Sequence, residues 1–387
     1  MGRPDLPRKE ASRHVDKLQP LDRAPRLQRL TQLMTTQGVD GVLLSQPANI
    51  EYFTGFKAVE PMEREAFAFV GTDGRKDFVT RQLYFGQTPD GFTPMDILDL
   101  PTHLKQLQQS GIATVGIEED NLTVAEHKLL LAAGVQTKGV EPKELRVAKT
   151  EEEIDRIRES CRLGDLTFTY MLSQIKEGLT ESQLRDILEQ HMRSQGISAA
   201  AFPTIVAIGE NGANPHQMPD NTPLTKNNFI TFDFGFVGLD GYQSDMTRTV
   251  FFGQPTEEDQ KMYSTVLTAQ EAVITHLQDA FGQNPEAELV ARDVDGVARQ
   301  IILDAGYLPE HFPHGTGHGI GIETHEPPFL NARSSETIKA GMVFSDEPGV
   351  YVPGKGGVRI EDLIAVHPDG KVEVLTHSPK ELLVIPA

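Results

Sequence analysis

The 387-residue sequence has one cysteine, no tryptophan and far fewer basic than acidic residues. The single cysteine, Cys161, excludes an intrachain disulfide and permits a reducing compartment. The 36 Lys and Arg residues stand against 56 Asp and Glu residues, and the net charge of −20 disfavours binding to nucleic acid or anionic lipid. No apolar run approaches the roughly 18 residues of a membrane span, and the N-terminus lacks the apolar segment of a secretory signal. We therefore expect a cytoplasmic protein that binds neither nucleic acid nor membranes.

The length and the balance of residue types favour a folded protein of two domains. Hydrophobic residues make up 38% of the chain and charged residues 24%, which is typical of soluble globular proteins. A chain of 387 residues favours two domains of about 100–200 residues each. We divide it into a polar N-terminal arm at 1–20, a smaller domain at 21–148 and a larger domain at 149–387.

Helical and strand patterns alternate in the smaller domain. Apolar spacing predicts a helix at 21–37, and a short apolar run predicts a buried strand after Gly38. Further strands are expected within 66–80 and at 112–117, and a second helix at 123–133. This alternation indicates an α/β unit with a mixed sheet.

The larger domain begins with clear helix start signals. Thr150 with Glu153, and Thr180 with Gln183, form the T-x-x-E/Q pattern of a capping box, in which two side chains satisfy free N–H groups at a helix start. Long helices are also expected within 256–305, and glycine-rich, β-branched segments separate them. Paired helices between antiparallel strands indicate an α+β domain.

The segment 228–253 predicts a hairpin that presents two aspartates. Apolar residues alternate along 230–236, so Asp233 lies on the other face of that strand. If the turn is the three-residue loop Gly238–Asp240, Asp233 lies directly across from Asp245. Like charges that face each other on a sheet are destabilising, so a divalent cation between them is expected.

The segment 341–366 repeats this arrangement around the turn PGKGG. Glu347 and Glu361 are equidistant from Gly354, so a turn centred there brings the two carboxylates together. A single acidic pair is more often a solvated surface, whereas two hairpins of matching geometry favour one shared site. Four carboxylates would be balanced by two divalent cations.

Histidines cluster in the glycine-rich segment HFPHGTGHGIGIETHEPP. Its glycines argue against a helical metal-binding pair at His314 and His318, and they allow a ligand to approach the backbone closely. His318 and His325 are seven residues apart, so they share a site only if the chain bends between them. His216, in a loop before the first hairpin, is either bonded to the backbone or a wall residue of the same site.

Four segments follow one another along the chain: DFGFVGLDGYQSDMTRT, HGTGHGIGIETHE, EPGVYVPGKGGVRIED and LTHSPKELLVI. Taken together in this order, they resemble the metal-dependent pita-bread peptidases of family M24. This family includes Xaa-Pro dipeptidases (prolidases), Xaa-Pro aminopeptidases and methionine aminopeptidases. The segment GVDGVLLSQPANIEYFTGF resembles the start of the creatinase/prolidase-type N-terminal domain. The resemblance implies an α+β fold, with a pita-bread catalytic domain at 149–387 and a smaller α/β domain before it.

The resemblance also implies roles for individual residues. The metal ligands would be Asp233, Asp245, His318, Glu347 and Glu361. His216, His325 and Glu347 would be catalytic, and His314 and Arg359 would contact the substrate. The two aspartates are twelve residues apart, whereas the family usually has eleven, and a turn one residue longer would keep them paired.

The implied activity is hydrolysis of the Xaa-Pro bond, with dipeptides that end in proline as the favoured substrates. An Xaa-Pro aminopeptidase acting on longer peptides is the nearest alternative, and opening of a small cyclic amide also stays open. A non-catalytic pita-bread binding module is disfavoured because all five ligands are kept. Four carboxylates and one imidazole suit two Mn²⁺ ions, with Co²⁺ or Zn²⁺ as alternatives. The resemblance further implies a homodimer whose substrate is a small peptide with proline at its second position.

Overall fold

The computed structural model describes residues 18–84, 86–197 and 199–387. The chain divides into two compact units, Pro20–Arg146 and Val147–Ala387, and residues 18 and 19 belong with the second unit. Residues 1–17 of the predicted polar arm lie outside the described part of the chain. No described helix combines the length and the apolar character needed to cross a membrane.

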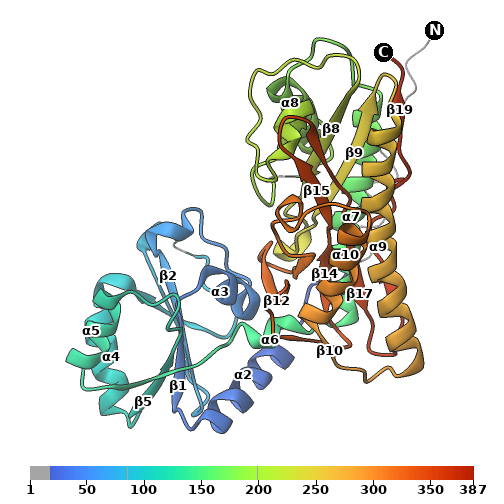
Figure 1. Cartoon of the computed structure of the whole chain (residues 1–387). Helices are drawn as coiled ribbons and strands as arrows, with labels where there is room; N and C mark the ends of the chain where they lie inside the picture. The colour runs from blue at the N-terminus through green and yellow to red at the C-terminus, as the bar shows by residue number, and fades with distance from the viewer. Residues whose placement is uncertain (1–17, 85, 198) are drawn as a thin grey trace. The chain divides into compact units, whose positions relative to one another are not determined.

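The N-terminal unit is built around one six-stranded sheet (Figure 1). Its strands are β1 (Gly41–Leu44), β2 (Ala66–Gly71), β3 (Lys76–Thr80), β4 (Thr93–Asp96), β5 (Thr114–Ile117) and β6 (Gln136–Gly139). They lie in the order β4-β3-β2-β1-β5-β6, and β1 pairs antiparallel with β2 but parallel with β5. The predicted mixed sheet is confirmed.

Five helices accompany this sheet. They are α2 (Ala24–Gln37), α3 (Pro47–Thr54), α4 (Leu100–Gln109), α5 (Val124–Ala132) and α6 (Glu144–Val147). Helices α4 and α5 lie together on one side of the sheet in Figure 1. Leu104 and Leu130 of these helices share a buried cluster with Phe69 and Val115 of the strands, so this face of the sheet forms one part of the core of the unit.

The C-terminal unit contains two larger sheets and two short strand pairs. The first sheet, in the order β19-β9-β8-β7, consists of β7 (Ile205–Ile208), β8 (Asn228–Phe234), β9 (Met246–Phe252) and β19 (Val384–Ile385). The second, in the order β12-β11-β14-β17-β18, consists of β11 (Gly317–Gly319), β12 (Glu326–Leu330), β14 (Val343–Asp346), β17 (Asp362–Val366) and β18 (Val372–Val374). The pairs are β15 (Gly349–Val352) with β16 (Gly356–Arg359) and β10 (Leu289–Val290) with β13 (Thr337–Ile338).

Four long helices pack on these strands: α7 (Glu151–Leu172), α8 (Glu181–Ser194), α9 (Glu257–Gln283) and α10 (Ala291–Asp304). Residues of α7 and α8 share one buried cluster with β7, β8 and β9, whereas α9 and α10 share another with β14 and β17. Each half of the unit thus pairs two helices with antiparallel strands, and the predicted α+β character is confirmed.

Helix starts follow the predicted local chemistry. Thr150 and Glu153 form a reciprocal capping box at the start of α7, with the Glu153 carboxylate accepting from the Thr150 N–H at 2.7 Å. Thr180 forms the same motif at the start of α8. A third box, Thr256 with Asp259, begins α9 and was not recognised from the sequence.

The register of the first hairpin corrects the sequence-based expectation. Asp233 pairs with Thr247, so the prediction that it faces Asp245 directly is wrong. The three-residue turn is Leu239–Gly241, because Asp240 adopts a left-handed φ of 52° there. Moving the turn by one residue moves every partner by two, and a shift of two keeps each side chain on its face. Asp245 therefore lies diagonally from Asp233, on the same side as Thr247.

The register of the second hairpin is as predicted. Asp346 pairs with Asp362 in one ladder, and Gly349 pairs with Arg359 in the next. Both pairs are equidistant from Gly354, whose φ of 76° forms the turn. Glu347 and Glu361 lie in the gap between the two ladders and come together from opposite strands.

Candidate functional site

A cavity of about 450 Å³ in the C-terminal unit gathers the residues singled out from the sequence. Its lining includes all of them: His216, Asp233, Asp245, His314, His318, His325, Glu347, Arg359 and Glu361. They come from β8, from β11, from the end of β16, from the positions just before β9 and β17, and from the loops between the strands. The cavity is therefore a single site assembled from both hairpins and from the histidine segment.

Three of these side chains form a cluster suited to a cation. Asp245, His318 and Glu361 are buried, and each offers a donor atom within 4.8 Å of the other two. Among the described residues, Oδ1 of Asp245 and Oε1 of Glu361 have no hydrogen-bond partner. A buried carboxylate oxygen without a donor is unfavourable unless a cation or a proton compensates it. The donor set of oxygen and imidazole ligands fits a divalent metal ion.

The electrostatics of the carboxylates agree with this assignment. Burial, and then the charges of Glu361 and Asp233, raise the pKa of Asp245 well above its usual range. Burial, followed by the charges of Glu347 and Asp233, does the same to the pKa of Glu361. Crowded buried carboxylates of this kind hold protons unless a positive charge replaces them. A bound divalent cation would supply that charge.

Glu347 and His318 form an ion pair within the same cluster. Their Oε1 and Nε2 atoms are 3.3 Å apart, and His318 Nε2 is also 3.7 Å from Asp245 Oδ2. Burial opposes both charges, but the pairing outweighs it and places the pKa of His318 at about 9 and that of Glu347 at about 2. An imidazole must lose its proton before it binds a metal, so cation binding would displace this proton.

Arg359 holds Asp233 in place. Its Nη2 lies 2.5 Å from Asp233 Oδ2, and its Nε donates to Thr247 Oγ1 at 2.9 Å. Its Nη1 donates to the Tyr351 hydroxyl at 2.9 Å. Because the side chain is buried and its donors are directed at protein oxygens, this geometry favours a role in orienting Asp233. Contact of Arg359 with the substrate stays a prediction.

Tyr351 joins two of the predicted residues and was missed in the sequence. Its hydroxyl also lies 2.7 Å from Nε2 of His314, so it bridges His314 and Arg359. Burial raises its pKa to about 12, which keeps the phenol protonated as a donor at neutral pH. Tyr351 lies four residues after Glu347 in EPGVY, and only the contacts of its hydroxyl in the folded protein show that it is directed to the site.

His216 and His325 lie at the exposed part of the cavity lining. The rings of His318 and His325 have centroids 4.2 Å apart, so the chain does bend between them. The bend includes a register shift in the β11–β12 ladder after His318. Partial burial, and then the neighbouring His318, lower the pKa of His325, which favours its neutral form at pH 7.

Apolar residues also line the cavity, and we call this part of the lining the apolar wall. It contains Phe202, Pro203, Ile205, Met218 and Phe329. Sequence reasoning missed this wall because apolar residues in strands and loops carry no chemical signature of their own. It leaves room beside the acidic cluster for an apolar group of a ligand.

Comparison with known proteins follows the division of the chain. Residues 155–368 match the model of metallopeptidase family M24, and residues 26–160 match the creatinase/prolidase N-terminal domain. An uncharacterized peptidase of Staphylococcus aureus is 35% identical over 361 residues, which cover 92% of this chain and 99% of that protein.

Solved structures show the same architecture. An Xaa-Pro dipeptidase from Bacillus anthracis is 33% identical, with a TM-score of 0.85 over 94% of this chain and 100% of that chain. An X-Pro aminopeptidase from Thermotoga maritima is 30% identical, with a TM-score of 0.83 over 93% of this chain and 99% of that chain. The expected two-domain architecture with a pita-bread domain is confirmed. The family model, the similar sequences and the similar structures agree with one another. The chain belongs to metallopeptidase family M24.

Proposed function

We propose that this protein hydrolyses Xaa-Pro peptide bonds with a pair of divalent cations. Its proposed ligands are Asp233, Asp245, His318, Glu347 and Glu361. The observation that carries the proposal is the buried cluster in which two carboxylate oxygens lack a partner among the described residues. Family M24 consists of dinuclear metal enzymes, which supports two ions at this site.

The chain's own residues supply the remaining chemistry. Bound divalent cations polarise a carbonyl group and activate a water molecule in sites of this class. His325 is neutral at pH 7 and lies on the exposed side of the cluster, where it can accept or return a proton. Glu347 is ionised and buried beside His318. Its carboxylate can therefore bind a cation, and it can also accept a hydrogen bond from a group that donates a proton in the reaction and so orient that group.

The apolar wall supports proline as the residue after the scissile bond. A proline ring is apolar, and its nitrogen has no N–H once it is in a peptide bond. Phe202 and Ile205 can contact such a ring without leaving a donor unsatisfied. Another residue at this position would bring an N–H that needs an acceptor.

We propose dipeptides that end in proline as the first substrate class. A second candidate, cleavage after the first residue of longer peptides, is favoured by one observation. Asp233, Thr247 and Tyr351 each accept from Arg359, so fewer of its five N–H donors are left for the proline carboxylate of a dipeptide. The solved relatives include both activities by name.

The test compares peptides of different length on metal-loaded protein. The kcat/KM values for Ala-Pro and Ala-Pro-Ala-Ala separate the two candidates, and Ala-Ala is the control without proline. Hydrolysis of Ala-Pro-Ala-Ala alone would exclude the dipeptidase. Protein that contains bound metal but cleaves no Xaa-Pro peptide would overturn the proposed function and favour a binding module.

The metal and the assembly are part of the same proposal. We propose Mn²⁺ as the favoured ion because carboxylates dominate the ligand set, with Co²⁺ and Zn²⁺ as alternatives. Activity after reloading stripped protein with each ion would rank them. A cytoplasmic homodimer remains our expectation from the sequence, and light scattering of the purified chain would test the dimer.

A further inference from the structure

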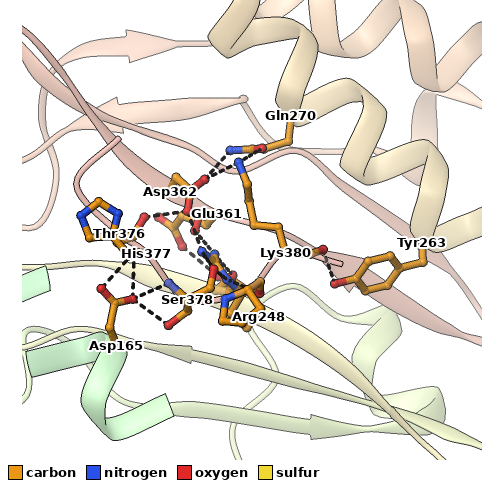
Figure 2. A network of polar contacts seen from close by, with 12 residues as sticks. Asp165, Arg248, Tyr263, Gln270, Glu361, Asp362, Thr376, His377, Ser378 and Lys380 are labelled. Carbon is orange, nitrogen blue, oxygen red and sulfur yellow. Dashed lines mark hydrogen bonds and ion pairs between the residues drawn. The ribbon is translucent and has the colours of Figure 1, made fainter. Parts of the chain in front are cut away.

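A buried polar network lies behind the cation-binding side of Glu361 (Figure 2). Its centre is Arg248, which is only 1% exposed. Its Nε donates to the carbonyl oxygens of Ser378 and Pro379 at 3.2 and 3.1 Å, and its Nη2 donates to Ser378 O at 2.9 Å. Arg248 thus binds the backbone of segment 376–380, near the end of the chain.

The same guanidinium also binds the backbone at Thr247 and at Glu361, beside the predicted site. Its Nη1 donates to the carbonyl oxygen of Thr247 at 3.0 Å and also to the carbonyl oxygen of Glu361. Its Nη2 lies 2.7 Å from Asp362 Oδ1. Arg248 therefore fixes the peptide that joins Glu361 to Asp362, and it fixes the neighbouring strand at Thr247.

Asp362 completes the network from the other side of this peptide. Its Oδ1 also accepts from Thr376 Oγ1 at 2.6 Å. Its Oδ2 accepts from Gln270 Nε2 at 2.9 Å and pairs with Lys380 Nζ at 2.8 Å. Figure 2 shows these side chains converging on Asp362 from α9 and from segment 376–380.

Segment 376–380 is itself anchored to two helices. Asp165 of α7 accepts from the N–H groups of His377 and Ser378 at 2.9 and 2.7 Å. Tyr263 of α9 donates to the carbonyl oxygen of Lys380 at 2.8 Å. The segment is thus a fixed support that joins α7 and α9 to the strand edge at Glu361.

The support reaches the acidic cluster through Thr247. The N–H of Glu361 donates to Thr247 O at 3.1 Å, and Thr247 Oγ1 donates to Glu361 Oε2 at 2.8 Å. Oε2 is therefore held in place, whereas Oε1 has no partner among the residues described. The geometry leaves one oxygen of Glu361 available to a cation at a fixed position.

We propose that Arg248 is a positioning residue for cation binding, which it supports by holding the Glu361–Asp362 peptide against segment 376–380. The inference rests on the proposed metal site. Groups that orient a metal ligand without touching the ion commonly change metal affinity by about 10–100-fold when they are replaced. A network that only stabilises the fold would change the unfolding temperature but not the affinity of the folded protein.

The test is a Mn²⁺ titration of the full-length, metal-stripped protein by calorimetry, below the unfolding temperature of every variant. We expect Arg248→Lys to raise the Kd for Mn²⁺ about 10-fold and Arg248→Met to raise it up to about 100-fold. Lysine keeps the charge but cannot reproduce the planar set of donors. Leu277→Ala in α9 is the control, because it removes buried apolar contacts in the core cluster away from this network.

The results separate this inference from the proposed function. Variants at Arg248 with a lower unfolding temperature but an unchanged Kd, like Leu277→Ala, would overturn the positioning role alone. Wild-type protein that binds no divalent cation would overturn the proposed metal site and this inference with it. If Arg248→Met does not fold, Lys380→Met tests the outer, partly exposed end of the network, and its Kd must still rise above that of Leu277→Ala.

Discussion

Glu361 and Asp362 are consecutive buried carboxylates whose surroundings are opposite. Oε1 of Glu361 has no partner in the described part of the chain, whereas both oxygens of Asp362 accept from cationic or amide donors. Burial raises the pKa of Glu361 well above its usual range. Burial alone would also raise that of Asp362, but Arg248 and Lys380 outweigh it and lower the pKa. Burial alone therefore does not decide the state of an acid: without donors it favours the protonated or cation-bound form, and with donors the ionised form.

The largest effect should come from Glu361→Gln. An amide cannot replace an anionic ligand, and loss of several kcal/mol of charge stabilisation corresponds to about a 10³-fold lower kcat/KM. Peptide cleavage and metal content of the purified variant would be measured together. In the metal-free state we expect no loss of stability, because the raised pKa of Glu361 favours a neutral carboxyl group there, and an amide is neutral as well.

Asp362→Asn should lower the stability of the metal-free protein, whereas Glu361→Gln should not. Removing one partner of a buried ion pair leaves Arg248 uncompensated and should lower the free energy of unfolding by about 3–5 kcal/mol. Urea unfolding in the presence of a chelator would measure it beside Glu361→Gln. Equal destabilisation by the two variants would break the comparison between the two acids.

The pH dependence of stability tests the role of the ionised Asp362 further. Because the folded-state pKa of Asp362 is lowered, its ionised form contributes stability above its unfolded pKa of about 3.9. That contribution is lost as the pH falls through the folded value. The stability difference between wild type and Asp362→Asn should therefore be constant near pH 7 and should narrow in acid.

Added metal should stabilise the wild type by less than Asp362→Asn destabilises it. A ligand at 100 times its Kd that binds only the folded state contributes about 2.7 kcal/mol. Thermal unfolding with and without Mn²⁺ would show the shift, and Glu361→Gln should not show it. An equal shift in both proteins would place the ion away from the acidic cluster.

Local chemistry predicted most of the fold, whereas the details of the site needed long-range contacts. Thr150 and Thr180 begin their helices as the sequence indicates, because a capping box is complete within four residues. The pairing of Asp233 was wrong by two residues, because the left-handed conformation of Asp240 moved the turn. Asp233 and Asp245 still lie on the same face, because side chains along a strand alternate with a period of two residues.

Residues that act through contacts distant in the chain were missed for a physical reason. Arg248 lies in the motif DMTRT and Tyr351 in the motif EPGVY, but nothing local shows where their side chains are directed. Arg248 acquires its role from carbonyl groups about 130 residues later in the chain, at Ser378 and Pro379. Only the folded strands and the anchored segment 376–380 bring these groups together.

Asp346→Asn should have the smallest effect and tests the rule that donors, rather than burial, decide whether a buried acid is ionised. Asp346 pairs in register with Asp362 and is completely buried, and neither of its oxygens has a hydrogen-bond partner among residues 18–84, 86–197 and 199–387. Burial, and then the charge of Asp362, raise its pKa well above the usual range, which favours its neutral form. Exchanging one neutral group for another should change the free energy of unfolding by less than about 1 kcal/mol. Urea unfolding of this variant and of Asp362→Asn measures the difference. A loss of unfolding free energy as large as that of Asp362→Asn would mean that Asp346 is ionised and paired. The rule would then hold for Glu361 alone.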